Sequence, residues 1–176
     1  MIEVIWHGRG GQGAFTAARL LGAAWCAEDG RYALAFPSFG PERRGAPMRA
    51  FTKLSTAPVG DRSASARGNV VVYLDETLFA PGFEAELAPG GTVLVNSERA
   101  FDDARVHAID ANGISQAVLG RAIPNTALLA ALLPLVPGLS RESLVAAVRS
   151  NMPARLQDKN IAVIDTVLAA REGEAL

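Results

Sequence analysis

The spacing of apolar residues predicts a strand followed closely by a helix at the start of the chain. Residues 3–7 combine β-branched and aromatic side chains and end at a cluster of glycines, which is typical of a strand. From Ala14 to about Glu28, apolar residues recur at helical spacing. The chain is therefore expected to begin with a strand, a glycine turn and a helix.

Two shorter patterns predict the next strands, over residues 32–36 and 48–54. The segment between them is rich in glycine and proline and is expected to be a loop. In the later strand the side chains alternate, which predicts one dry face and one face that is charged or lies at a partner. Its two faces carry Met48, Ala50 and Thr52 on one side and Arg49, Phe51 and Lys53 on the other.

The rest of the chain alternates between apolar runs and helical patterns, which predicts an α/β fold. Continuous apolar runs are typical of strands buried on both faces of a parallel sheet. We expect one domain over residues 1–176, with a three-layer, doubly wound, mostly parallel sheet and a helical C-terminal third. The runs are 69–74, 91–96 and 105–109, and the helical patterns are 76–87 (two short pieces), 111–119, 125–133, 141–152 and 160–171.

One helix start has a recognisable cap. Ser140 precedes the pattern at 141–152 and is predicted to be its N-cap. Ser143 stands where a capping box has glutamate or glutamine, so the box is expected to be incomplete.

Composition removes several classes of protein. The chain has 176 residues, of which 49% are hydrophobic, too many for a disordered protein. Its net charge of −1 argues against a nucleic-acid binder. The single cysteine, Cys26, permits no internal disulfide and no iron–sulfur cluster, and is interpreted as a small buried residue of the first helix. With no signal pattern and no apolar span, we expect a cytoplasmic protein without membrane insertion.

The small net charge hides an uneven distribution. Between Pro41 and Arg67 six cations stand against two carboxylates, a balance of +4, so the remainder of the chain is acidic. The basic excess thus lies in and just after the predicted glycine- and proline-rich loop.

Gly8, Gly10 and Gly13 form a G-x-G-x-x-G pattern between the first strand and the first helix. Glycines let an anion approach the amides at a helix N-terminus. A dinucleotide site also needs an acid at the end of the second strand, where this chain has Phe-Pro-Ser at 36–38, so NAD is disfavoured. A phosphate or pyrophosphate site stays open, and so does a purely structural role in close strand–helix contact.

The loop after the second strand carries Gly40, Glu42, Arg43 and Arg44. Ligand sites of α/β sheets lie beyond strand ends, and adjacent arginines offer forked donors to phosphate or carboxylate groups. The alternative is a solvated basic turn in which Glu42 pairs with one arginine for little net energy.

Other candidates are weaker. His7 ends the first strand and could be a base or a packed core residue, and Asn125 and Thr126 could cap a helix. The sequence contains no nucleophile elbow, no Walker A lysine and no cluster of metal ligands, so no catalytic residue is assigned.

Two motifs together carry a resemblance to a known family. His-Gly-Arg-Gly-Gly-Gln-Gly at 7–13 and Phe-Pro-Ser-Phe-Gly-Pro-Glu-Arg-Arg-Gly-Ala-Pro at 36–47 resemble the gamma subunit of 2-oxoacid:ferredoxin oxidoreductases, such as pyruvate:ferredoxin oxidoreductase. The likeness continues at 70–75, 91–96 and 124–126. In some members the equivalent piece is a domain of one long chain.

The resemblance implies a non-autonomous subunit of a complex that oxidatively decarboxylates a 2-oxoacid to acyl-coenzyme A and CO2. Thiamine diphosphate, magnesium and 4Fe–4S clusters are implied for the partner alpha, beta and ferredoxin-like delta subunits, with none bound by this chain alone. The acceptor is ferredoxin or an NAD-reducing flavin subunit. Pyruvate, 2-oxoglutarate, branched-chain and aryl 2-oxoacids such as phenylglyoxylate all stay open.

The resemblance also implies a group of residues around the coenzyme A region and an apolar face exposed in the isolated chain. Whether Arg43 and Arg44 touch coenzyme A or another subunit stays open, and the alternative function is a free-standing nucleotide-binding or regulatory α/β domain. The implied residues are Gly8, Arg9, Gly10, Gly11, Gln12, Gly13, Gly40, Glu42, Arg43, Arg44, Asn125 and Thr126.

Overall fold

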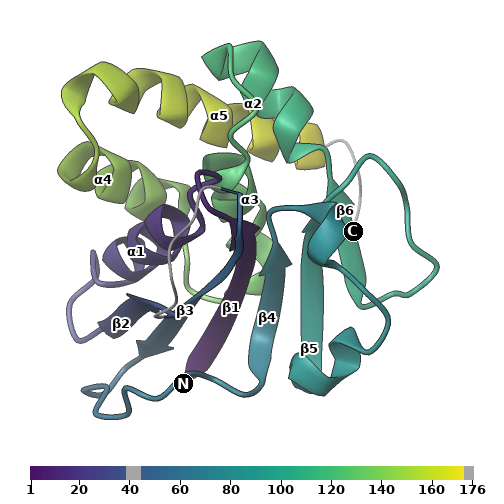
Figure 1. Ribbon diagram of the computed structural model, residues 1–176. Coiled ribbons are helices and arrows are strands. Elements are labelled where there is room, and N and C mark those ends of the chain that lie inside the picture. Colours follow the sequence, from purple (N-terminus) through teal and green to yellow (C-terminus); the bar gives the residue numbers. More distant parts are fainter. Residues whose placement is uncertain (39–44, 173–176) are drawn as a thin grey trace.

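The computed structural model describes residues 1–38 and 45–172, which fold around one six-stranded sheet (Figure 1). The strands lie in the order β2-β3-β1-β4-β5-β6. Their bounds are β1 Ile2–Arg9, β2 Tyr32–Pro37, β3 Pro47–Ser55, β4 Gly68–Tyr73, β5 Leu87–Asn96 and β6 Val106–Ile109.

The sheet is mixed, as its connections require. β1, β4, β5 and β6 pair in parallel, whereas β3 runs antiparallel to both β1 and β2. Only nine residues separate the end of β2 from the start of β3 in the sequence, fewer than the crossover of a parallel pair needs, so the antiparallel pairing of these strands is expected. Three of the five pairings among the described strands are parallel, which confirms the predicted α/β fold with a mostly parallel sheet.

The α-helices of the described residues gather on one face of the sheet (Figure 1). Trp6, Val72 and Leu94 point from the strands into a core that the helices cover with Leu21, Leu128 and Val163. The helical C-terminal third is confirmed. The bounds are α1 Ala14–Trp25, α2 Ala111–Leu119, α3 Asn125–Ala131, α4 Arg141–Asn151 and α5 Ala154–Glu172.

The opposite face has a thinner cover. Ile5, Phe51, Val71 and Val93 form a second core there, against aromatic side chains from the segments after β4 and β5. The two short helical pieces predicted within 76–87 are the 3-10 turns η1 Glu76–Leu78 and η2 Phe83–Glu86. Phe79 packs on Phe83 and Phe101 at ring-centroid distances of 5.0 and 5.3 Å. The third layer therefore consists of aromatic side chains and short turns.

Two local expectations were wrong. The capping box of α4 is complete, because the Ser143 hydroxyl accepts from the Ser140 backbone amide just as Ser140 accepts from that of Ser143. The Ser143 hydroxyl thus accepts the hydrogen bond that a glutamate or glutamine side chain accepts in the usual capping box. Cys26 is exposed, because α1 ends one residue earlier, at Trp25.

In the described part of the chain the exposed large hydrophobic side chains are Met1, Tyr32 and Leu156. The apolar face that the resemblance implies therefore stays a prediction. Within the same residues, no helix combines the length and apolar character needed to cross a membrane.

Candidate functional site

The glycine turn joins β1 to α1 in a conformation that needs glycine at several positions. A Cβ atom on Gly8 would lie 3.2 Å from the Cβ of Ala14, so strand and helix approach closely there. Gly11 and Gly13 have φ values of +99° and +85°, in the left-handed region that favours glycine. Gly8 thus has the structural role left open by the sequence, which is to allow close strand–helix contact. Gly11 does not share it, because a Cβ atom there would have nothing within 4 Å.

The polar side chains of the turn are directed to Asp75, at the end of β4. Arg9 Nε and Gln12 Nε2 donate to Asp75 Oδ2 at 3.1 and 3.0 Å, and Arg9 Nη2 donates to Thr77 at 2.8 Å. Burial raises the pKa of the Asp75 carboxyl, but hydrogen bonds from Thr77 and Gln12 and the charge of Arg9 outweigh it and lower the pKa. These bonds fix the turn on β4.

The same turn also holds the chain that follows the loop carrying Arg43 and Arg44, here called the basic loop. Gly10 donates to the carbonyl of Ala46 at 3.0 Å, and Gly45 donates to the carbonyl of Gly10 at 3.1 Å. Before the loop, the amide of Ser38 donates to the carbonyl of Arg49 at 2.8 Å. The predicted site residues Gly40, Glu42, Arg43 and Arg44 lie outside the described residues, and the residues that follow them, Gly45 and Ala46, lie beside the turn.

Asn125 is brought to the turn and Thr126 is not. Asn125 opens α3, its side chain is buried against Gly13, and its Oδ1 accepts from the amide of Thr126 at 2.9 Å. The hydroxyl of Thr126 is buried and donates to Asn160 at 2.7 Å, so this residue ties α3 to α5.

His7, Glu86 and Arg49 form a polar cluster on the thinly covered face of the sheet. His7 Nε2 is 2.7 Å from Oε2 of Glu86, and Arg49 Nη2 is 3.0 Å from Oε1 of the same carboxylate. The His7 ring stacks on Tyr73 with centroids 4.6 Å apart. Sequence reasoning found His7 but missed Glu86, which reaches it from η2 and carries no sequence signal for this contact.

Burial governs the protonation of this cluster. It lowers the pKa of His7, and the charge of the neighbouring Arg49 lowers it further. The Glu86 carboxylate raises the pKa of His7 but does not outweigh burial. Burial and the Glu86 carboxylate raise the pKa of Tyr73 to about 12. The imidazole therefore binds a proton less readily than an exposed histidine does.

On the other side of the glycine turn, a crevice of about 390 Å³ opens at the ends of β4 and β5. Its lining includes Gln12 and several carboxylates, with Arg99 as the cation. Carboxylates repel phosphate, so this side of the turn does not suit a phosphate group. The acidic members are Asp75, Glu76, Glu98 and Asp110.

Comparison with known proteins decides the family. The model of the pyruvate ferredoxin/flavodoxin oxidoreductase family matches residues 3–170. The chain belongs to this family. It is 43% identical over 163 residues to pyruvate synthase subunit PorC of Methanothermobacter marburgensis, covering 91% of this chain and 92% of that protein. It is 38% identical over 170 residues to the pyruvate/ketoisovalerate oxidoreductases common subunit gamma of Thermococcus kodakarensis, covering 91% of both.

A solved structure agrees with this assignment to the oxidoreductase family. The PORC subunit of pyruvate oxidoreductase from Thermotoga maritima superposes with a TM-score of 0.77 at 34% identity, covering 94% of each chain. The resemblance to gamma subunits of 2-oxoacid oxidoreductases, predicted from the two motifs, is confirmed.

The strand order agrees with the absence of the acid that a dinucleotide site has at the end of its second strand. In a dinucleotide fold the second strand neighbours the first, so its terminal acid faces the ribose. Here β3 lies between β1 and β2, and β2 is an edge strand. The end of β2 is thus displaced from the position of a ribose-binding acid.

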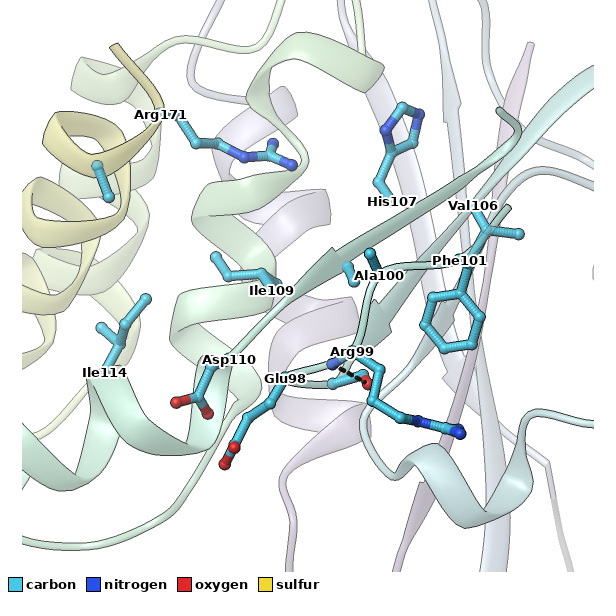
Figure 2. Close-up of a pocket in the computed structure, with 13 residues that line it drawn as sticks. Glu98, Arg99, Ala100, Phe101, Val106, His107, Ile109, Asp110, Ile114 and Arg171 are labelled. Atoms are coloured by element: carbon cyan, nitrogen blue, oxygen red, sulfur yellow. Dashed lines mark hydrogen bonds between the residues drawn. The ribbon is translucent and has the colours of Figure 1, made fainter. Parts of the chain in front are cut away.

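A larger cavity, of about 590 Å³, lies beside the edge strand β6 (Figure 2). Figure 2 shows His107 of β6 and Arg171 of α5 bordering it. Burial and then the Arg171 charge lower the pKa of His107. Within the described residues, no group of three histidine, cysteine or carboxylate side chains could hold a metal ion.

Proposed function

We propose that this chain is the non-autonomous gamma subunit of a cytoplasmic complex that oxidatively decarboxylates a 2-oxoacid and transfers the acyl group to coenzyme A. Its own part is to hold the phosphate groups of coenzyme A beside the glycine turn. Family membership supports the first statement, and the anchoring of the basic loop at Gly10 supports the second.

The charges around the turn support one direction of approach for coenzyme A. Coenzyme A carries a pyrophosphate and a 3′-phosphate, so it requires donors and positive charge. The β4–β5 side of the turn presents carboxylates. On the β3 side, Gly45 and Ala46 are bonded to Gly10, and these two residues directly follow Arg43 and Arg44 in the sequence. Forked guanidinium donors there would match phosphate oxygens.

The redox cofactors are proposed to lie on the alpha, beta and delta subunits, with ferredoxin or an NAD-reducing flavin subunit as acceptor. One cysteine in the sequence cannot supply the four thiolates of a 4Fe–4S cluster, so this chain does not fit that group. Thiamine diphosphate and magnesium are likewise assigned to partners.

The test is the double variant Arg43→Ala, Arg44→Ala in the assembled complex. Charge-assisted bonds to phosphate contribute about 1.5–3 kcal/mol each, so the KM for coenzyme A should rise about tenfold or more while the KM for the 2-oxoacid stays unchanged. Arg43→Lys with Arg44→Lys keeps the charge but removes the forks, and should give an intermediate KM.

Arg62→Ala is the matched control, because Arg62 lies on the exposed segment before β4 and makes no ion pair within the described residues. An unchanged KM for coenzyme A in the double variant would refute phosphate contact by this loop. Dissociation of the subunit from the complex would instead place both arginines at a subunit interface.

A further inference from the structure

A second cavity, of about 620 Å³, lies on the helical face of the molecule. We call it the α5 groove. It is bounded by the segment joining α2 to α3, by the first turns of α1 and α3, and by the beginning of α5. Its floor is apolar, and is made by Leu119, Ile123, Met152 and Leu156. Leu156 is 42% exposed, the only exposed large hydrophobic side chain among the described helices.

Three cations border this apolar floor. Arg121 comes from the α2–α3 segment, while Arg155 and Lys159 stand four residues apart on one face of α5. All three are exposed, and none has an ion pair or side-chain hydrogen bond within the described part of the chain. By contrast, Arg141 and Arg149 on neighbouring α4 are each paired with a carboxylate of α5.

No carboxylate lines the groove. Its cations are therefore uncompensated at close range, and a complementary surface must bring negative charge. Asn125 adds a fixed donor. Its side chain is 7% exposed, its Oδ1 is occupied by the amide of Thr126, and its Nδ2 has no acceptor within the described residues.

We propose that the α5 groove docks an acidic, amphipathic segment of a partner subunit. An apolar side chain of that segment would cover Leu156, and its carboxylates would pair with Arg121, Arg155 and Lys159. This inference rests on the proposed function, because it requires a complex. The apolar floor with cations from two separate elements favours an extended segment over a compact anion.

The experiment co-expresses this chain with its partner subunits and measures assembly by affinity capture and size-exclusion chromatography. Arg155→Glu with Lys159→Glu should weaken association about tenfold or more, since like charges would then face the partner carboxylates. Arg155→Lys with Lys159→Arg keeps both charges and should assemble as the unaltered chain does. Leu156→Ala should weaken assembly without any change of charge.

Thermal unfolding of the isolated charge variants separates docking from folding, because exposed charged side chains of α5 without partners should leave the melting temperature unchanged. Full assembly of the charge-reversed variant overturns the proposal. So does full assembly with a raised KM for coenzyme A, which would make the groove a small-ligand site. If the unaltered chain captures no partner, the proposed function fails first and this inference fails with it.

Discussion

A Cβ atom placed on Gly13 would lie 2.6 Å from the side-chain nitrogen of Asn125, closer than non-bonded atoms approach. The glycine turn and the start of α3 are therefore in direct contact. This contact relates two motifs that are far apart in the sequence, and it gives Gly13 a packing role in addition to its positive φ.

Gly13→Ala should be more destabilising than Gly11→Ala. Both residues have positive φ, so each alanine bears a backbone cost of about 1–2 kcal/mol. Only at residue 13 does the added methyl also meet Asn125, which must shift out of a buried position. Urea unfolding of the two variants measures the difference, and equal losses of unfolding free energy would contradict the contact.

Lowering the pH from about 7 to 5 should destabilise the chain through its histidines. Burial depresses the pKa of His7 below its ordinary value of 6.5. The unfolded chain then binds more protons in this range, so unfolding free energy is lost as the pH falls below about 6.5 toward the folded pKa. The carboxylates with depressed pKa values, such as Asp75, titrate at lower pH.

Urea titrations at several pH values test this, with His7→Gln as the comparison. Glutamine can keep a bond to Glu86 but does not titrate, so the variant should show a flatter pH dependence. His107→Gln should remove the part of the pH dependence that belongs to His107, whose half-buried side chain also has a lowered pKa. An identical pH dependence for His7→Gln and the unaltered chain would show that His7 does not titrate differently in the folded state.

The sequence predicted the elements well because most of them repeat a simple period. Apolar runs marked β4 and β5, and helical spacing gave α2 its bounds of 111–119. α5 begins at Ala154, six residues before the predicted start, because polar residues such as Arg155 and Asp158 interrupt the apolar spacing there. The α5 groove was missed for the same reason.

The site itself was less predictable, because its contacts join distant segments. The glycine pattern indicated a close strand–helix turn, which Gly8 confirms, but no residue pattern linked Glu86 to His7, and only the family resemblance grouped Asn125 with Gly13. Alternation in β3 indicated a charged face, yet Lys53 on that face is almost fully buried. Such pairings depend on sheet order, which periodicity does not determine.

Removing the two carboxylate partners of Lys53 should destabilise the fold more than removing the charge of Lys53 itself. Its Nζ lies 2.6 Å from Asp61 and 3.3 Å from Glu3. Glu3→Gln with Asp61→Asn would leave the buried ammonium without a countercharge, whereas Lys53→Met removes the charge and keeps the aliphatic volume. The double variant should therefore melt at a lower temperature than Lys53→Met, and the reverse order would show that the buried Lys53 side chain does not need its countercharges.

Asp75→Asn should loosen the glycine turn while the rest of the sheet keeps its stability. The substitution replaces the carboxylate that accepts from Arg9 and Gln12, so the Arg9 bond loses its ion pair and the Gln12 bond loses its ionised acceptor, at a cost of about 1–2 kcal/mol. Because Gly10 is bonded to Gly45 and Ala46, the base of the basic loop should loosen with the turn. Amide exchange should become faster at 9–13 and 45–46 while the amides of β4 and β5 keep their protection.

Asp103→Asn is the control, since Asp103 pairs with Arg105 before β6 and should leave the turn unchanged. In the assembled complex, Asp75→Asn should raise the KM for coenzyme A if the turn positions the loop. A slower turn exchange, or protection lost equally across the whole sheet, would show that Asp75 does not act through the glycine turn.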